Sequence, residues 1–146
     1  MPVGEKEIVD AIVTLAAEEA VEAGYAQIST AHLLIALSRI SEAQDLRDSA
    51  AIRELNREFE QLGIEPRIFR RRLRAILGRR NEKPHGNTIH RSAGCKAVFT
   101  AAQRAASDAG EPWTPVWLLR GVFASLGDDV SRVAAESRTD DIPYEL

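Results

Sequence analysis

The sequence predicts an all-α protein built from two copies of one helical motif. Apolar residues recur every three or four positions along most of the 146-residue chain, which is the spacing of helices, and no alternating segment predicts a strand. Residues 23–34 and 109–119 share a glycine, a capping residue and a Leu-Leu pair. Gly24 matches Gly110 at an offset of 86 residues, and Ser29 matches Thr114 at an offset of 85. Self-similarity of this kind indicates a repeat architecture.

The two turns share their chemistry. Gly24 and Gly110 follow alanine-rich runs, where a residue in the left-handed conformation would end a helix. Ser29 and Thr114 stand where an N-cap belongs, and such a cap contributes about 1 kcal/mol. Pro115 follows at the first helical position, which tolerates the missing N–H group. Each copy therefore predicts a helix, a stop, a short loop and a capped helix.

Helical periodicity and capping signals place seven helices along the chain. In the first half they cover Gly4–Ala23, Ser29–Ile40, Ala50–Leu62 and residues 65–77, with a surface loop over Ser41–Ser49. In the second half one helix begins after Ser92, and two more cover Thr114–Leu126 and Asp128–Ser137.

Length and composition predict one domain over residues 1–146. We expect a first repeat at about 5–78, a connector at 79–91, a second repeat at about 92–137 and a tail at 138–146. The single cysteine, Cys95, has no internal partner for a disulfide, which suits a reducing, cytoplasmic environment. The N-terminus lacks the apolar stretch of a signal peptide, and no run approaches the roughly 20 residues of a membrane span. A net charge of −3 argues against a polycation that seeks nucleic acid.

The repeat resembles the Clp N-terminal domain, the double four-helix repeat at the front of Clp-type AAA+ unfoldases such as ClpA, ClpB and ClpC. Ala16–Ala20 through Gly24, followed by Ile28–Leu34, is similar to the family's Ala/Glu-rich helix, glycine and Thr-Glu-His-Leu-Leu-like helix start. Trp113–Leu119 is similar to a weaker second copy, and Ile89–Ser92 resembles the start of the second repeat. The resemblance covers roughly residues 5–137. It implies two pseudo-repeats of a four-helix motif packed into one bundle, with the second repeat truncated.

The resemblance implies a protein-binding module that docks substrates or adaptor proteins for an unfoldase, without catalysis. In some members, the glutamates of the Thr-Glu-His motif help to hold phosphoarginine, but Ala31 and Val116 stand at those positions here. Neither side chain can supply the charge-assisted bonds of a carboxylate. We therefore expect a degraded phosphoarginine pocket. No phosphate-binding GxxxxGK[ST] loop is present, and the divergent tail favours a stand-alone relative of the unfoldases.

Protein-binding candidates gather at the two repeat turns. Exposed aromatic side chains are favoured binding anchors, although they also fill cores. A structural role is the alternative for His32, which has no nearby Cys or His with which to bind a metal. The candidates are Tyr25, Thr30, Ala31, His32, Trp113, Pro115, Val116 and Trp117.

A second candidate surface is basic. Residues 67–80 contain seven arginines, of which Arg67, Arg70, Arg71 and Arg74 share one helix face. This stripe is either a solvated face or a surface for an acidic or phosphate-bearing partner. The alternative function is therefore a helical nucleic-acid-binding or regulatory protein.

The remaining reactive side chains do not predict chemistry. Lys96 lies beside Cys95, but adjacent helical side chains point apart, so a buried structural cysteine is the better interpretation. His85 and His90 lack a supporting ligand cluster. No spacing of nucleophile, base or paired carboxylates indicates an enzyme, and no cofactor or metal is expected.

Overall fold

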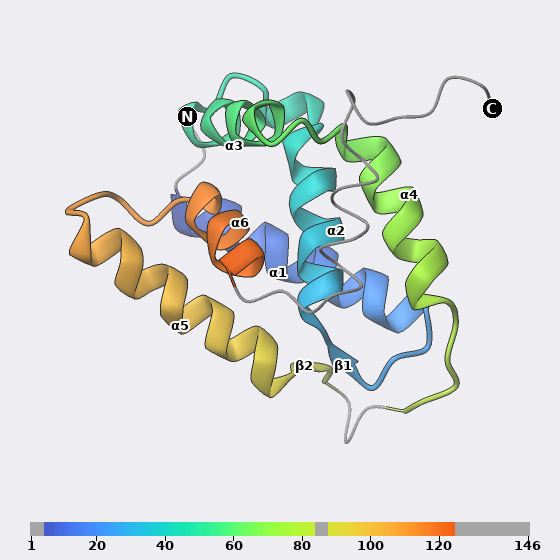
Figure 1. The fold of residues 1–146 in the computed structure, drawn as a ribbon. Coiled ribbons are helices and arrows are strands. Elements are labelled where there is room, and N and C mark those ends of the chain that lie inside the picture. Colours follow the sequence, from blue (N-terminus) through green and yellow to red (C-terminus); the bar gives the residue numbers. More distant parts are fainter. Residues whose placement is uncertain (1–4, 84–87, 125–146) are drawn as a thin grey trace.

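The structure, a computed structural model, describes residues 5–83 and 88–124, and within them the protein is almost wholly helical (Figure 1). This confirms the all-α prediction. The elements are α1 (Glu5–Glu22), β1 (Gln27–Ile28), α2 (Thr30–Ser41), the 3-10 helix η1 (Gln44–Leu46), α3 (Ala50–Gln61), α4 (Pro66–Leu77), β2 (His90–Arg91), α5 (Ala93–Asp108) and α6 (Pro115–Ala124).

Helix α2 is the central element of the fold. All of its residues are buried except Thr30 and Arg39, which are half-buried. Helices α1, α3, α4, α5 and α6 all pack against it, and Figure 1 shows it running through the middle of the molecule. A helix that is buried on nearly every side needs this surrounding layer to remove its apolar residues from water.

The turn chemistry is confirmed at the first copy and in part at the second. Gly24 and Gly110 both adopt positive φ angles, of 79° and 68°. The Ser29 hydroxyl accepts the His32 N–H at 3.3 Å and so caps α2. At the second copy, Thr114 directly precedes α6, which is the expected N-cap position, and its hydroxyl donates to the Glu54 carboxylate of α3 at 2.9 Å. This bond ties the start of α6 to the first repeat.

The described parts of the connector, residues 79–83 and 88–91, include a strand that their composition does not predict. Strands β1 and β2 pair in parallel, with Gln27 opposite His90 and Ile28 opposite Arg91, so the expectation of no strand is wrong for these two short segments. Two residues are too few to produce an alternating pattern, and only the partner segment defines the strand. The N–H of Ser92 donates to the Ile28 carbonyl at 2.9 Å, which joins the two repeats directly before α5 begins.

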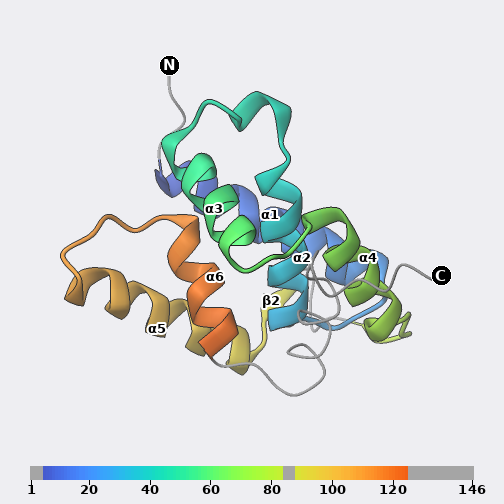
Figure 2. The ribbon, with the colours of Figure 1, turned by 45° about the horizontal axis from the view of Figure 1, so that its top comes forward.

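The two repeats place equivalent residues in the core. Val98 and Ala102 of α5 are buried and correspond, at the offset of 86, to the buried Ile12 and Ala16 of α1. At the offset of 85, Leu118 and Leu119 of α6 correspond to Leu33 and Leu34 of α2, and all four are buried. Helix α5 packs on α6 as α1 packs on α2, and Figure 2 shows α6 lying between α5 and α3. The seventh helix expected at Asp128–Ser137 lies outside the described residues.

Gly24 offers a test of how the connector holds the first turn. A Cβ at Gly24 would lie 1.8 Å from the Arg80 carbonyl oxygen, whereas a Cβ at Gly110 would meet nothing within 4 Å. Both glycines have positive φ, which costs an L-residue about 1–2 kcal/mol. We therefore expect Gly24→Ala to lower the free energy of unfolding in urea by clearly more than Gly110→Ala. Equal losses would show that the connector does not pack against this turn.

Candidate functional site

The first repeat turn is organised around His32. The His32 Nδ1 accepts the N–H of Ser29 at 3.0 Å and lies 2.9 Å from the Ser29 hydroxyl, so each residue caps the other. Tyr25 meets the imidazole edge-on, with 4.7 Å between the ring centroids. The geometry gives His32 the backbone-bonded position at the helix start that the structural interpretation expects.

The other imidazole nitrogen of His32 is unusual. Because Nδ1 accepts a backbone N–H, the proton of the neutral ring is assigned to Nε2. Nε2 is buried and has no hydrogen-bond partner within the described part of the chain. Burial lowers the pKa of His32 to about 4, with Glu19 opposing this shift and Arg80 reinforcing it. His32 is therefore neutral at physiological pH and lines a cavity of about 200 Å³ together with Glu19, Glu22 and Arg74.

Tyr25 is buried rather than displayed. Its hydroxyl donates to the Leu77 carbonyl at 2.6 Å, which satisfies the C-terminal end of α4. The Arg80 guanidinium covers its ring at 4.5 Å. These contacts hold Tyr25 between the first turn and the end of α4.

The second repeat turn buries its family-motif positions and half-exposes its tryptophans. Pro115 and Val116 are buried, and Ala31, the equivalent of Val116, is 6% exposed. Trp113 packs against Phe99 with 6.4 Å between ring centroids, and the Arg120 guanidinium lies 5.0 Å from the ring centre of Trp117. Neither turn therefore carries a carboxylate at its family-motif position.

Trp117 also lines an open apolar groove of about 670 Å³ between α5 and α6. Its floor and walls are mostly small residues, and Thr30 and Arg120 supply polar groups. Ala97, Ala101 and Ala105 follow one another at four-residue steps along the exposed face of α5. The other lining residues are Gly94, Val98, Ala102, Gly121 and Ala124. Within the described residues no helix covers this face.

The four arginines of the basic stripe of α4 do not share one environment. Arg67, Arg71 and Arg74 are exposed, as expected, but Arg70 is half-buried and turns toward α2. It is held there by an ion pair with Glu42 and by a 3.4 Å bond to the Ser38 carbonyl. Because α4 packs on α2, the side of the stripe that faces α2 is drawn into contacts. Arg67, Arg70 and Arg74 line a pocket with Arg39 and Arg47, whereas Arg71 does not.

The reactive residues of the described segments lie apart from one another. Cys95 is fully buried, and burial raises the pKa of its thiol to about 11 against the opposing influence of Arg91. No group of three His, Cys, Asp or Glu side chains that could hold a metal occurs in residues 5–83 and 88–124. None of the helices formed by these segments is long and apolar enough to cross a membrane.

The comparisons agree with the fold and the repeat. The family model of the Clp repeat N-terminal domain matches residues 7–114. The chain belongs to this family. Clp N-terminal domains are non-catalytic modules of Clp-type ATPases that generally mediate protein interactions. Comparison with curated proteins found no match.

Two parts of the site were missed by the sequence analysis. The alanines of the α5–α6 groove look like ordinary helix residues, and Arg39 and Arg47 lie outside the basic stripe. The repeat offset could have revealed the groove, because it places small residues of α5 opposite larger residues of α1. It aligns the exposed Ala101 with the half-buried Leu15, and the exposed Ala105 with the buried Glu19.

The buried His32 predicts how stability depends on pH. Its pKa is about 4 in the folded protein and near the ordinary 6.5 when unfolded, so the unfolded chain binds more protons between these values. The contribution of this pKa difference to the free energy of unfolding is fully present above pH 6.5. It is lost as the pH falls toward 4, by up to about 3 kcal/mol.

Urea unfolding between pH 7 and pH 4.5 measures this dependence. In His32→Asn the amide oxygen can still accept the Ser29 N–H but cannot take up a proton, so we expect a shallower loss of stability. His90→Asn, at an exposed position of β2, is the matched control and should keep the slope of the unmodified protein. An unchanged slope in His32→Asn would contradict the assignment.

Proposed function

We propose that this protein docks substrates or adaptor proteins for a Clp-type AAA+ unfoldase, in the cytoplasm and without catalysis by the domain itself. The observation that carries the proposal is the open apolar groove between α5 and α6, which Trp117 lines. Large exposed apolar surfaces mark protein-interaction sites. We further propose that residues 1–146 act as one domain, with a connector at 79–91 between two repeats.

The pseudo-repeat supports an amphipathic helix as the occupant of the groove. At the offset of 85, His32, Ala36 and Arg39 of α2 correspond to Trp117, Gly121 and Ala124 of α6. In the first repeat this face of α2 lies under α4. His32 and Arg39 line pockets that α4 also lines. The α5–α6 groove is therefore the counterpart of the surface on which α4 packs in the first repeat. A helix with one apolar face fits this groove.

The small residues of the groove favour this occupant. Gly94 on its wall lets a helix backbone approach closely, as small residues do at helix contacts, whereas Gly121 lets α6 itself lie close to Ala102 of α5. Trp117 supplies a broad apolar surface with two side-chain torsions to immobilise. Of the predicted binding residues, Thr30 and Trp117 line this groove. Trp113 packs on Phe99 of α5 outside the groove lining, whereas Tyr25 and His32 lie by α4.

The groove predicts how binding responds to a single charge. Ala101→Glu places a carboxylate in the apolar floor, where binding would have to desolvate it. We expect this variant to weaken binding of a labelled peptide helix, with leucines at i, i+3, i+4 and i+7, by at least about fivefold, or about 1 kcal/mol. Fluorescence anisotropy at two salt concentrations measures the affinity, which should change little with salt.

Gln103→Glu is the control, because it adds the same charge to an exposed position of α5 outside the groove. It should bind like the unmodified protein. Equal weakening by both variants, or no saturable binding of the peptide, would contradict the groove as the docking site.

The substituted motif positions predict a loss of phosphoarginine recognition. Ala31 and Val116 are buried and carry no carboxylate, so a guanidinium has no bidentate partner there. In an NMR titration we expect free phosphoarginine to leave the amide signals of residues 30–32 and 115–117 in place. Saturable shifts at these signals would show that other residues have rebuilt the pocket.

A further inference from the structure

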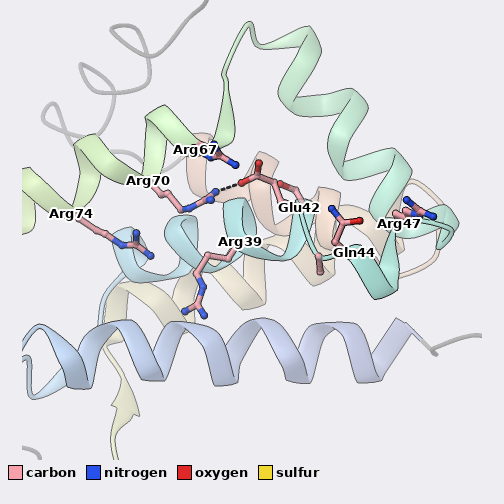
Figure 3. Close-up of a pocket in the computed structure, with 9 residues that line it drawn as sticks. Arg39, Glu42, Gln44, Arg47, Arg67, Arg70 and Arg74 are labelled. Carbon is pink, nitrogen blue, oxygen red and sulfur yellow. Dashed lines mark hydrogen bonds and ion pairs between the residues drawn. The ribbon is translucent and has the colours of Figure 1, made fainter.

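Figure 3 shows an arginine pocket at the C-terminal end of α2, with a volume of about 760 Å³. It is lined from three elements. Arg67, Arg70 and Arg74 reach into it from α4, Arg39 comes from α2, and Arg47 follows η1. The remaining lining residues are Ser41, Glu42, Ala43 and Gln44.

The charges of this pocket are not balanced. Glu42 is the acidic residue that lines it, and Glu19 and Glu18 pair with its arginines from α1. Five guanidinium groups therefore face at most three carboxylates. Arg47 and Arg67 form no ion pair with any residue that the structure describes. A concave surface with an excess of one sign concentrates oppositely charged ligands.

Three of the five guanidinium groups are held in place. Glu19 is buried and accepts bonds from Arg39 at 3.3 Å and from the Nε of Arg74 at 3.2 Å. Arg70 is fixed between Glu42 and the Ser38 carbonyl. A guanidinium offers five N–H donors, so each fixed arginine keeps donors for a further acceptor. A pocket whose donors are already oriented loses less side-chain entropy when a ligand binds.

We propose that the arginine pocket is a second binding site, separate from the α5–α6 groove, for an acidic segment of a protein partner. Guanidinium forks match carboxylates with paired, charge-assisted hydrogen bonds. Arg67, Arg70 and Arg74 lie on one face of α4, and the seven residue steps from Arg67 to Arg74 rise about 10 Å along the helix. An extended chain rises about 3.3 Å per residue, so three or four residues of an acidic segment cover this distance.

The composition of the pocket favours a polypeptide over a nucleic acid. Single-stranded nucleic acids bind where aromatic side chains stack on bases, and the described residues that line the pocket include none. Glu42 lies among the arginines and would repel a continuous phosphate backbone. The chain as a whole carries a net charge of −3, which disfavours the long-range attraction on which nucleic-acid binding depends.

A labelled 12-residue peptide with four evenly spaced glutamates tests the proposal. The same peptide with glutamines at those four positions is the uncharged control. We expect saturable binding of the glutamate peptide alone, weakening as salt rises from 50 to 300 mM. The double variant Arg47→Glu/Arg67→Glu should weaken binding at least about tenfold, because it reverses the two unpaired charges of the pocket.

The matched control is Arg53→Glu/Arg57→Glu, which makes the same charge change at exposed positions of α3 outside the pocket. It should weaken binding less than about threefold at 150 mM salt, where charges more than about 8 Å away are largely screened. Circular dichroism confirms that each variant is folded.

Three results would overturn the site. They are equal weakening by the two double variants, binding of the glutamine peptide as tight as that of the glutamate peptide, and tighter binding of a 12-nucleotide single strand than of the glutamate peptide. Ala101→Glu should leave glutamate-peptide binding unchanged, so a failure of the α5–α6 groove and a failure of the arginine pocket are distinguishable.

Discussion

The buried carboxylate of Glu19 connects α1, α2 and α4 of the first repeat. It projects from α1 and receives Arg39 of α2 and Arg74 of α4. A carboxylate this deeply buried requires cationic partners, because an isolated buried charge is strongly destabilising. The pairing fixes where the basic helix α4 lies on α2. It also places Glu19 beside His32 and holds Arg39 and Arg74, which line the arginine pocket.

The second repeat has an apolar surface where the first repeat has the charged surface that α4 covers. The positions equivalent to Glu19, His32 and Arg39 are Ala105, Trp117 and Ala124. Without a buried carboxylate, the face has no group that would hold a basic helix such as α4. Burial of apolar surface becomes the available driving force, which is non-directional and tolerates varied partners. The same backbone motif therefore forms a polar packing surface for α4 in one copy and an apolar groove in the other.

The α5–α6 groove and the arginine pocket differ in the forces by which they would bind, so one partner could use both. The α5–α6 groove would bind through apolar contact and the arginine pocket through charge. A partner that carried both an amphipathic helix and an acidic segment could engage them together. Joining two weak contacts on one chain raises the overall affinity through effective concentration, provided that the linker spans the two sites. Docking of this kind suits a module that must hold a partner and later release it.

The local elements of the fold could be predicted from sequence because their causes are local. Helical periodicity, Gly24, Ser29 and Ser92 specify where helices begin and end within a few residues. The repeat and the family resemblance follow from the same segments and were confirmed. The strand pair was missed because each strand is two residues long and is defined by a partner more than 60 positions away.

The binding surfaces were decided by the tertiary structure. From sequence, Arg67, Arg70, Arg71 and Arg74 share one helix face, yet packing of α4 on α2 turns Arg70 inward and brings Arg67, Arg70 and Arg74 together with Arg39 and Arg47. Pockets form between elements, and sequence periodicity describes the faces of one element at a time. The sequence by itself therefore determined the helices of the described segments, the caps at Ser29 and Ser92, and the family. Only helix packing decided which side chains stay open to a partner, since exposure depends on what each face meets.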